Sequence, residues 1–349
     1  MQNSSVIPWK MGVEIELLAP PDKSRQDLAI SIAHYFGARV RRIFYVQGEP
    51  SKVPGTPFFE NLTLGFVVED DQGRLLAQCV DDLTLQNNLN QKQPPQPGWF
   101  RIVSDEPRLL RLTMQNADPE QSISEVLQPI AELFGTTLQK NDSGMCRVTD
   151  STGASIAIAV PLPGERERPC ELITPPIEKD HFNRLDELLA LAKKLKFTVP
   201  DEGATHLHFD ATPICNTLVL VNLVNILGKH SKAIKKHIGT NENCRRLGDW
   251  PQGLFDLVNN KGFINLPWEQ ARLELVKLKL TKYCDFNLRN LIHTDINKHT
   301  FEVRILPVWI DAKRIVDVAV FFTRLMNWAI DNKGIVNKVP DHFDELLEF

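Results

Sequence analysis

Three short segments of the chain carry ionisable side chains two residues apart, with apolar residues between them. The ionisable residues are Glu14 and Glu16 in the first segment, His206, His208 and Asp210 in the second, and Glu302 and Arg304 in the third. Residues i and i+2 of a β-strand face the same side of a sheet, so each segment would direct its ionisable groups to one face. A sheet containing all three strands would therefore have an acidic, imidazole-rich face.

Such a face needs a compensating positive charge. Two carboxylates about 4 Å apart repel by about 4 kcal/mol at an effective dielectric constant near 20. A divalent cation removes this repulsion, and carboxylate oxygens together with one or two imidazoles suit Mg²⁺ or Mn²⁺. These ions commonly bridge the phosphates of a nucleotide. A solvated outer face would explain one such pair, but it would have to hold independently for all three segments.

Four segments follow, in order, the motifs of a known family. They are Gly12-Val-Glu-Ile-Glu16, Cys170-Glu-Leu-Ile-Thr-Pro-Pro176, His206-Leu-His-Phe-Asp210 and Phe301-Glu-Val-Arg304. This pattern resembles the putative amidoligase family, which is similar to glutamine synthetase and glutamate–cysteine ligase. A further family motif is similar to the segment around Asn287. The resemblance covers about residues 12–36 and 120–330.

The resemblance implies an α+β fold, with an antiparallel β-sheet flanked by helices like that of glutamine synthetase and glutamate–cysteine ligase. It implies a single catalytic domain over residues 1–349, in which residues 39–118 are an inserted β-hairpin and loop region. The implied activity is ATP-dependent joining of a carboxylate to an amine through an acyl phosphate. The expected cofactors are ATP and Mg²⁺ or Mn²⁺. The expected partners are small-molecule or peptide carboxylates and amines, without other nucleic acid or membrane, and the oligomeric state stays open.

The resemblance also assigns roles to individual residues. The metal ligands it implies are Glu14, Glu16, Glu171, His206 and Glu302. The residues it implies for binding the nucleotide are Arg304, His208 and Asn287, of which Arg304 faces phosphate and His208 faces nucleotide or substrate. The catalytic residues it implies are Arg304, His208 and Asp150, and Asp82 competes with Asp150 for the family's Asp-x-Ser position. Thr174 stands where the family usually has serine, and this change keeps the hydroxyl group.

Two other functions stay open. A zinc metallohydrolase could use His206, His208 and Asp210 as ligands, and it would be active without nucleotide. A degenerate ligase could persist as a binding module, although every expected ligand position is filled.

Two further groups of residues are candidates for substrate binding. Arg289 lies beside Asn287 and could bind a substrate carboxylate. The lysines between residues 229 and 236 form a basic segment that favours a solvated helix end.

The elements that would position these residues are indicated by periodicity and capping. Residues 13–17, 155–160, 205–210 and 300–306 have strand patterns, and residues 39–46 and 62–78 are predicted to form strands with a hairpin tip at 70–73. Helices are predicted over residues 24–36, closed by Gly37, and over 122–134, 180–196, 212–227 and 268–280. Asp311 is expected to cap the final long helix.

Composition sets the remaining limits. The 349 residues include 40 Lys and Arg against 44 Asp and Glu, a formal net charge of −4, so no global field would attract DNA, RNA or an anionic membrane. Six cysteines without a Cys-x-x-Cys pair favour reduced thiols in a cytoplasmic protein. Neither a P-loop nor a placed Gly-x-Gly-x-x-Gly segment is present. The polar start of the chain and its longest apolar stretch, which asparagines interrupt, predict no signal peptide and no transmembrane span.

Overall fold

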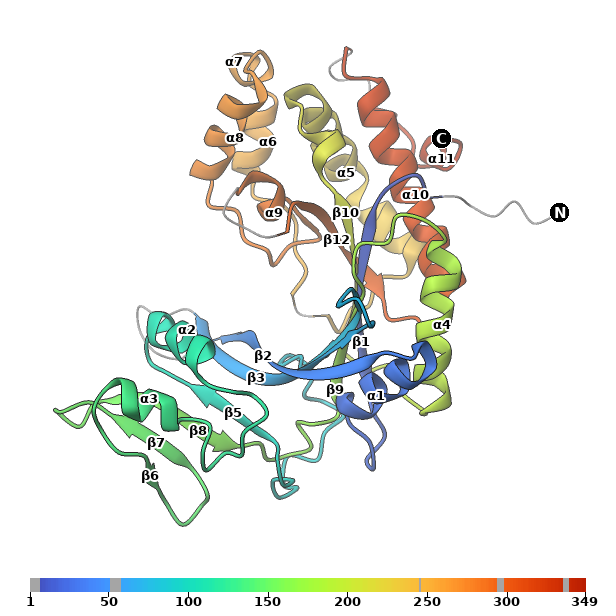
Figure 1. Cartoon of the computed structure of the whole chain (residues 1–349). Helices are drawn as coiled ribbons and strands as arrows, with labels where there is room; N and C mark the ends of the chain where they lie inside the picture. Colours follow the sequence, from blue (N-terminus) through green and yellow to red (C-terminus); the bar gives the residue numbers. More distant parts are fainter. Residues whose placement is uncertain (1–6, 51–57, 245, 294–297, 335–338) are drawn as a thin grey trace. The chain divides into compact units, whose positions relative to one another are not determined.

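A computed structural model describes residues 7–50, 58–244, 246–293, 298–334 and 339–349 (Figure 1). Its contacts divide the chain into two compact units. The first unit contains Met1–Ile15, Pro175–Leu189 and Glu202–Phe349, and the second contains Glu16–Thr174 and Ala190–Asp201. Strand β1 (Met11–Leu18) and helix α4 (His181–Lys194) each run from one unit into the other.

The first unit has an antiparallel sheet in the order β11-β12-β10-β1. Its other strands are β10 (Ala204–Asp210), β11 (Phe286–Asn287) and β12 (Thr300–Pro307). Its helices are η1 (Thr212–Ile214), α5 (Thr217–Ile238), α6 (Gln252–Val258), α7 (Lys261–Ile264), α8 (Trp268–Lys277), α9 (Arg289–Ile292), α10 (Ala312–Asp331) and α11 (Asp344–Leu347). Helix α5 packs against α10 and β12.

The second unit has an antiparallel sheet in the order β9-β4-β3-β5-β8-β7-β6, and β2 also pairs with β3. The strands are β2 (Arg39–Pro50), β3 (Phe58–Glu69), β4 (Leu75–Val80), β5 (Phe100–Val103), β6 (Gln139–Lys140), β7 (Cys146–Thr149), β8 (Ser155–Pro161) and β9 (Pro169–Ile173). The helices α1 (Arg25–Phe36), α2 (Pro107–Asn116) and α3 (Gln128–Leu133) pack on these strands. Antiparallel strands with flanking helices in both units confirm the predicted α+β class.

Several predicted boundaries are confirmed. Helix α1 begins after Ser24, which forms a capping box with Asp27, and it ends at Gly37 with a left-handed φ of 64°. The hairpin tip between β3 and β4 is closed by Asp70, whose carboxylate accepts backbone hydrogen bonds from Gln72 and Arg74. Asp311 caps α10 by accepting a hydrogen bond from the backbone N–H of Lys313.

Two helix predictions are wrong in their extent. The helix predicted over residues 122–134 is only α3, because Pro129, which lacks an N–H, occupies its first turn. The helix predicted from residue 212 is interrupted after η1. Helix α5 instead begins at Thr217, where the side chain of Asn216 accepts hydrogen bonds from two backbone N–H groups, and it extends to Ile238.

The core of the second unit contains a network of buried charges. The Asp81 carboxylate is fully buried and lies 2.5 Å from Nη2 of Arg166 and 3.6 Å from Nη2 of Arg25. Arg25 is also fully buried, donates to the carbonyl oxygens of Leu64 and Arg166, and lies over the ring of Trp99. These interactions connect α1 to β3, β4 and the segment before β9. The Asp81 carboxylate is the negative charge that compensates both buried guanidinium groups.

Within the described residues, no disulfide bond joins any of the six cysteines. No helix within the described ranges combines the length and apolar character needed to cross a membrane.

Candidate metal centre

The three segments singled out in the sequence are neighbours in the sheet of the first unit. In the antiparallel pair β1 and β10, Glu14 lies opposite His206, and in the pair β10 and β12, His208 lies opposite Glu302. Their apolar neighbours Val13, Leu207 and Val303 are fully buried. The alternation predicted for these strands is therefore confirmed, and the register brings their ionisable residues together.

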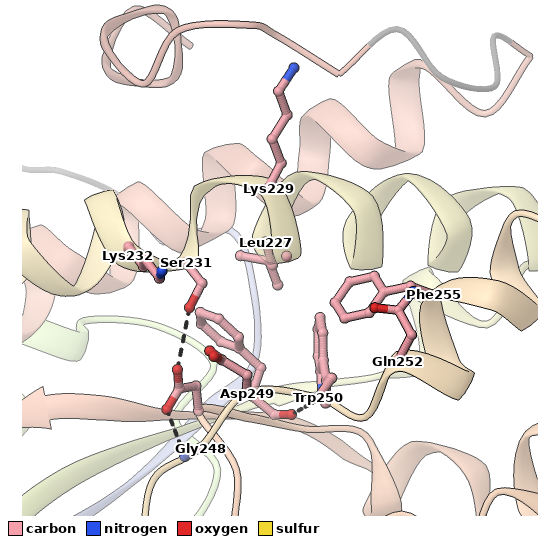
Figure 2. A pocket seen from close by; sticks show the side chains of 12 residues that line it. Leu227, Lys229, Ser231, Lys232, Gly248, Asp249, Trp250, Gln252 and Phe255 are labelled. Atoms are coloured by element: carbon pink, nitrogen blue, oxygen red, sulfur yellow. Dashed lines mark hydrogen bonds between the residues drawn. The ribbon is translucent and has the colours of Figure 1, made fainter.

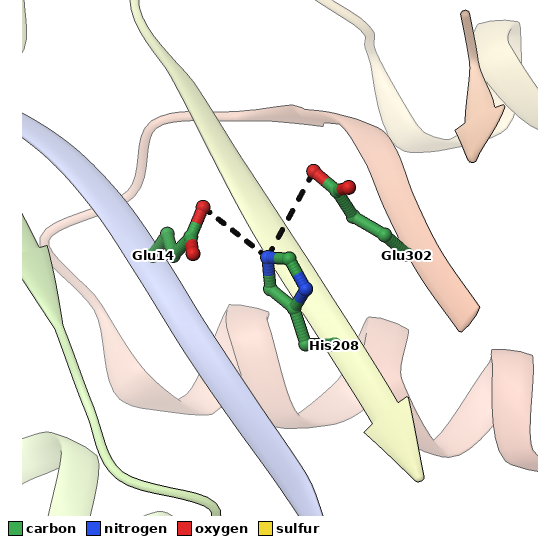
Figure 3. Close-up of side chains that lie close together, drawn as sticks. All are labelled: Glu14, His208 and Glu302. Atoms are coloured by element: carbon green, nitrogen blue, oxygen red, sulfur yellow. Dashed lines mark ion pairs between the residues drawn. The ribbon is translucent and has the colours of Figure 1, made fainter. Parts of the chain in front are cut away.

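The ionisable side chains of these strands meet at short distances (Figure 3). Nε2 of His208 lies 3.2 Å from Oε2 of Glu14 and 3.8 Å from Oε1 of Glu302. Nδ1 of His206 lies 3.5 Å and 3.8 Å from the same two oxygens. Two imidazoles therefore lie between two carboxylates that come from strands on either side of β10.

Burial excludes a solvated outer face as the explanation for this cluster. Glu14 and His208 are each 8% exposed, and His206 and Glu302 are each 4% exposed. Carboxylates are rarely buried to this extent unless a positive charge or a metal ion compensates them.

The donor atoms fit a divalent cation. Glu14, His208 and Glu302 each offer a ligand atom, and these three atoms lie within 4.8 Å of one another. Two carboxylate oxygens and one imidazole nitrogen suit Mn²⁺ and Mg²⁺. Thr300 lies behind His208, with its Oγ1 3.3 Å from Nδ1 of the imidazole. A hydrogen bond there would direct Nε2 toward the carboxylates, as commonly occurs behind histidine ligands.

The two carboxylates favour the ionised form. Burial would raise the pKa of Glu14, but His208, His206 and the ammonium of Lys298 outweigh it and hold this pKa well below its ordinary value. Burial likewise opposes ionisation of Glu302, but His208, Arg304 and His206 lower its pKa to about 2. Both side chains are therefore acceptors that can bind a cation at neutral pH.

The two imidazoles differ in their electrostatic environment. Burial disfavours a charge on His208, but the carboxylates of Glu14 and Glu302 outweigh it and raise its pKa. Burial and then the guanidinium of Arg304 lower the pKa of His206 in spite of the same carboxylates. His206 therefore favours the neutral form, whereas His208, whose charged form the carboxylates favour, would release its proton when it binds a metal ion.

Two residues fix the Glu302 carboxylate. Nη1 of Arg304, two residues along β12, lies 2.5 Å from Oε1 of Glu302. Nδ2 of Asn287, the register partner of Glu302 in β11, donates to Oε2 over 2.6 Å. Arg304 and Asn287, both predicted to bind nucleotide, therefore lie within the cluster and orient Glu302.

Sequence reasoning did not identify Lys298. Its Nζ lies 2.7 Å from Oε1 of Glu14, and its side chain is 49% exposed. The side chain of Lys298 thus contacts a buried carboxylate of the cluster and is itself half exposed to solvent. The signal available in the sequence was a lysine shortly before the strand that contains Glu302, but only the pairing of β1 with β10 and of β10 with β12 places it next to Glu14.

Two further predicted metal ligands belong to the second unit. Glu16 and Glu171 are buried and belong to the second unit, where Glu171 pairs with Val80 in the register of β9 and β4. Their roles as metal ligands stay predictions. Arg289 is the exposed first residue of α9.

Both candidates for the family's Asp-x-Ser position form turns in the second unit. The carboxylate of Asp150, between β7 and β8, accepts hydrogen bonds from Thr152 and Ala154. The carboxylate of Asp82 accepts hydrogen bonds from the backbone and hydroxyl of Thr84. These contacts show how each turn is stabilised, and the catalytic role of Asp150 stays a prediction.

Comparison with known protein families identifies the family of this chain. A family model described as putative amidoligase enzyme matches residues 7–326, nearly the whole chain. No curated protein and no solved structure matches the chain significantly. The predicted likeness to the fold of glutamine synthetase therefore stays a prediction.

Proposed function

This chain belongs to the putative amidoligase enzyme family, and we propose that it joins a carboxylate to an amine in an ATP-dependent reaction. The observation that carries this proposal is the buried cluster of Glu14, His208 and Glu302, in which the Arg304 guanidinium donates a hydrogen bond to the Glu302 carboxylate. A family of amide-forming ligases and a site suited to a divalent cation fit together, because such cations bind the phosphates of ATP.

The proposed reaction has two steps. The substrate carboxylate attacks the γ-phosphorus of ATP, the bond to the ADP oxygen breaks, and an acyl phosphate forms. The amine nitrogen then attacks the acyl carbon, the carbon–oxygen bond to phosphate breaks, and the nitrogen loses a proton. The products are an amide, ADP and inorganic phosphate.

The residues of the chain would act mainly by positioning and neutralising charge. Glu14, His208 and Glu302 would hold Mg²⁺ or Mn²⁺, which supplies Lewis-acid neutralisation of phosphate oxygens when bound. Arg304 and Asn287 hold the Glu302 carboxylate in place. The half-exposed ammonium of Lys298 offers a positive charge to an anionic substrate at the edge of the cluster.

The experiment is a coupled assay of the purified chain with Mg²⁺, ATP and mixtures of amino acids or peptides. We expect ADP and phosphate to be released only when a carboxylate and an amine are both present, and mass spectrometry should detect the amide. Glu302→Gln and Glu14→Gln should abolish turnover, because each removes an anionic ligand at almost constant volume. Full activity in both variants would contradict the proposed site.

The zinc hydrolase alternative has less support from the structure. Its third ligand would be Asp210, but Oδ1 of that residue accepts hydrogen bonds from the backbone and hydroxyl of Thr212. Activity without nucleotide would nevertheless favour it over the ligase. A degenerate ligase acting as a binding module would show no turnover in the same assay, but it would bind ATP in a calorimetric titration.

A further inference from the structure

A cavity of about 470 Å³ lies in the first unit, lined by residues of α5, α6, β11 and the segment 248–250 (Figure 2). Its volume is within the range of small-molecule binding sites. No residue of the proposed reaction lines it. We propose that this cavity is a second small-molecule site, and that it binds a zwitterionic amino compound with an apolar side chain, such as a free α-amino acid.

The apolar wall of the cavity is built from three aromatic rings. The ring centroid of Trp250 lies 6.3 Å from that of Phe255 and 5.6 Å from that of Phe286. Nε1 of Trp250 donates to the carbonyl oxygen of Phe286 over 2.6 Å, so the indole is held in one orientation. A fixed aromatic wall suits an apolar side chain.

One glycine allows this wall to form. Gly228 lies inside the 22-residue helix α5, where glycine costs about 1 kcal/mol relative to alanine. A Cβ atom added at Gly228 would lie 2.3 Å from Cε1 of Phe255. The glycine therefore permits the ring of Phe255 to lie directly on the helix backbone.

A second wall is fixed by a buried carboxylate. Oδ2 of Asp285 lies 2.6 Å from Nζ of Lys235 and accepts a hydrogen bond from Ser231, while Oδ1 accepts one from the backbone N–H of Gly248. These contacts connect α5, the segment before Asp249 and the residue preceding β11. Asp285 thus has a structural role, and its charge is neutralised within the protein.

Apart from Asp285, the charged residues of the lining are Asp249, Lys232 and Lys229. The carboxylate of Asp249 is 68% exposed and lies 3.6 Å from Lys235, which contacts Asp285 more closely. Lys232 is exposed and forms no ion pair with any other described residue. Lys229 points away from the cavity in Figure 2 and pairs with Asp341. Asp249 can therefore bind an ammonium group and Lys232 a carboxylate.

The position of the cavity separates it from the candidate metal centre. Phe286 lines the cavity, whereas the next residue of β11, Asn287, donates to the Glu302 carboxylate. Adjacent residues of a strand point to opposite faces. An occupant of the cavity would therefore lie on the other side of β11 from Glu302, and it would be bound apart from the reacting groups.

The proposal can be tested by calorimetric titration of the full chain, without ATP or metal, so that the result is independent of the proposed ligase activity. The probes are L-phenylalanine, L-leucine and L-methionine, and the single-charge analogues phenethylamine and 3-phenylpropanoate. We expect at least one of the three amino acids to bind. Phenethylamine and 3-phenylpropanoate, which each lack one charged group of phenylalanine, should bind at least about tenfold more weakly than the amino acid. The absence of binding by all three amino acids at millimolar concentration would overturn the proposal.

Variants locate the binding. Asp249→Asn should weaken amino-acid binding about tenfold without affecting 3-phenylpropanoate, and Lys232→Met should weaken amino-acid binding without affecting phenethylamine. Gly228→Ala should abolish binding by displacing Phe255. Gly253→Ala is the matched control, because a Cβ there meets only Leu278, at 3.8 Å. Should Asp249→Asn and Lys232→Met bind as wild type while Glu302→Gln loses binding, the ligand would lie at the metal centre and the proposal would be wrong.

Discussion

Nδ2 of Asn287 donates a 2.6 Å hydrogen bond to Oε2 of Glu302, the residue opposite it in the neighbouring strand. Hydrogen bonds to a ligating carboxylate fix its orientation, and their removal typically lowers metal affinity about 10- to 100-fold. We expect Asn287→Ala to lower Mn²⁺ affinity by that factor in an electron paramagnetic resonance titration. Asn265→Ala serves as a control, because the exposed amide of Asn265 donates to the carbonyl oxygen of Lys261 in α7. Equal affinity in the wild type and Asn287→Ala would contradict this role.

Lys298 should act on the metal centre in the opposite direction. Its ammonium lies 2.7 Å from Oε1 of Glu14, so it repels a second cation near this carboxylate. We expect Lys298→Met to raise Mn²⁺ affinity severalfold, and Lys298→Arg to leave it close to wild type. The same titration measures both variants. A lower Mn²⁺ affinity in Lys298→Met would show that the lysine supports metal binding.

Asp150 can be tested with a substitution that preserves its turn. The asparagine side chain keeps the oxygen that accepts the hydrogen bonds from Thr152 and Ala154. The predicted catalytic role therefore requires Asp150→Asn to lose turnover while its thermal unfolding midpoint stays close to wild type. Unchanged turnover would restrict Asp150 to a structural role in the β7–β8 turn.

Cys215 provides a test of pH dependence. Desolvation by burial, with a smaller contribution from Asp210, raises the pKa of its thiol to about 11. Only the thiolate reacts, so at pH 8 about one thiol in a thousand is reactive, and the reactive fraction grows about tenfold per pH unit up to about pH 10. Iodoacetamide labelling followed by peptide mass spectrometry should show this increase. A rate that levels off at about pH 9.5, as for an ordinary thiol with a pKa near 8.5, would contradict the raised pKa.

The buried pair of Asp81 and Arg166 should contribute strongly to stability. Removing the carboxylate leaves the guanidinium groups of Arg166 and Arg25 buried without their anionic partner, which typically costs about 3–5 kcal/mol. We expect Asp81→Ala to lower the free energy of unfolding by this amount in urea denaturation. The exposed pair Lys313 and Asp317 offers a control, since Asp317→Ala should cost under about 1 kcal/mol. Similar losses in both variants would argue against a special role for the buried network.

The sequence by itself determined the local features of this protein. The period-two alternation around Glu14, His208 and Glu302 predicted strands that carry ionisable residues on one face, because side chains alternate along any extended chain. The predicted helix over residues 24–36, closed by Gly37, likewise matches α1 closely, because helix ends depend on neighbouring residues. The same motifs carried the family resemblance that the match over residues 7–326 confirms.

Only the tertiary structure decided which side chains meet. The position of Lys298 beside Glu14, the hydrogen bond from Asn287 to Glu302, and the cavity between Trp250 and Gly228 all join segments far apart in the sequence. Local propensity cannot predict such contacts, because strand register and helix packing depend on how distant apolar surfaces fit together. The start of α5 also escaped prediction, since a turn of η1 and the cap at Asn216 replaced the helix expected from Thr212.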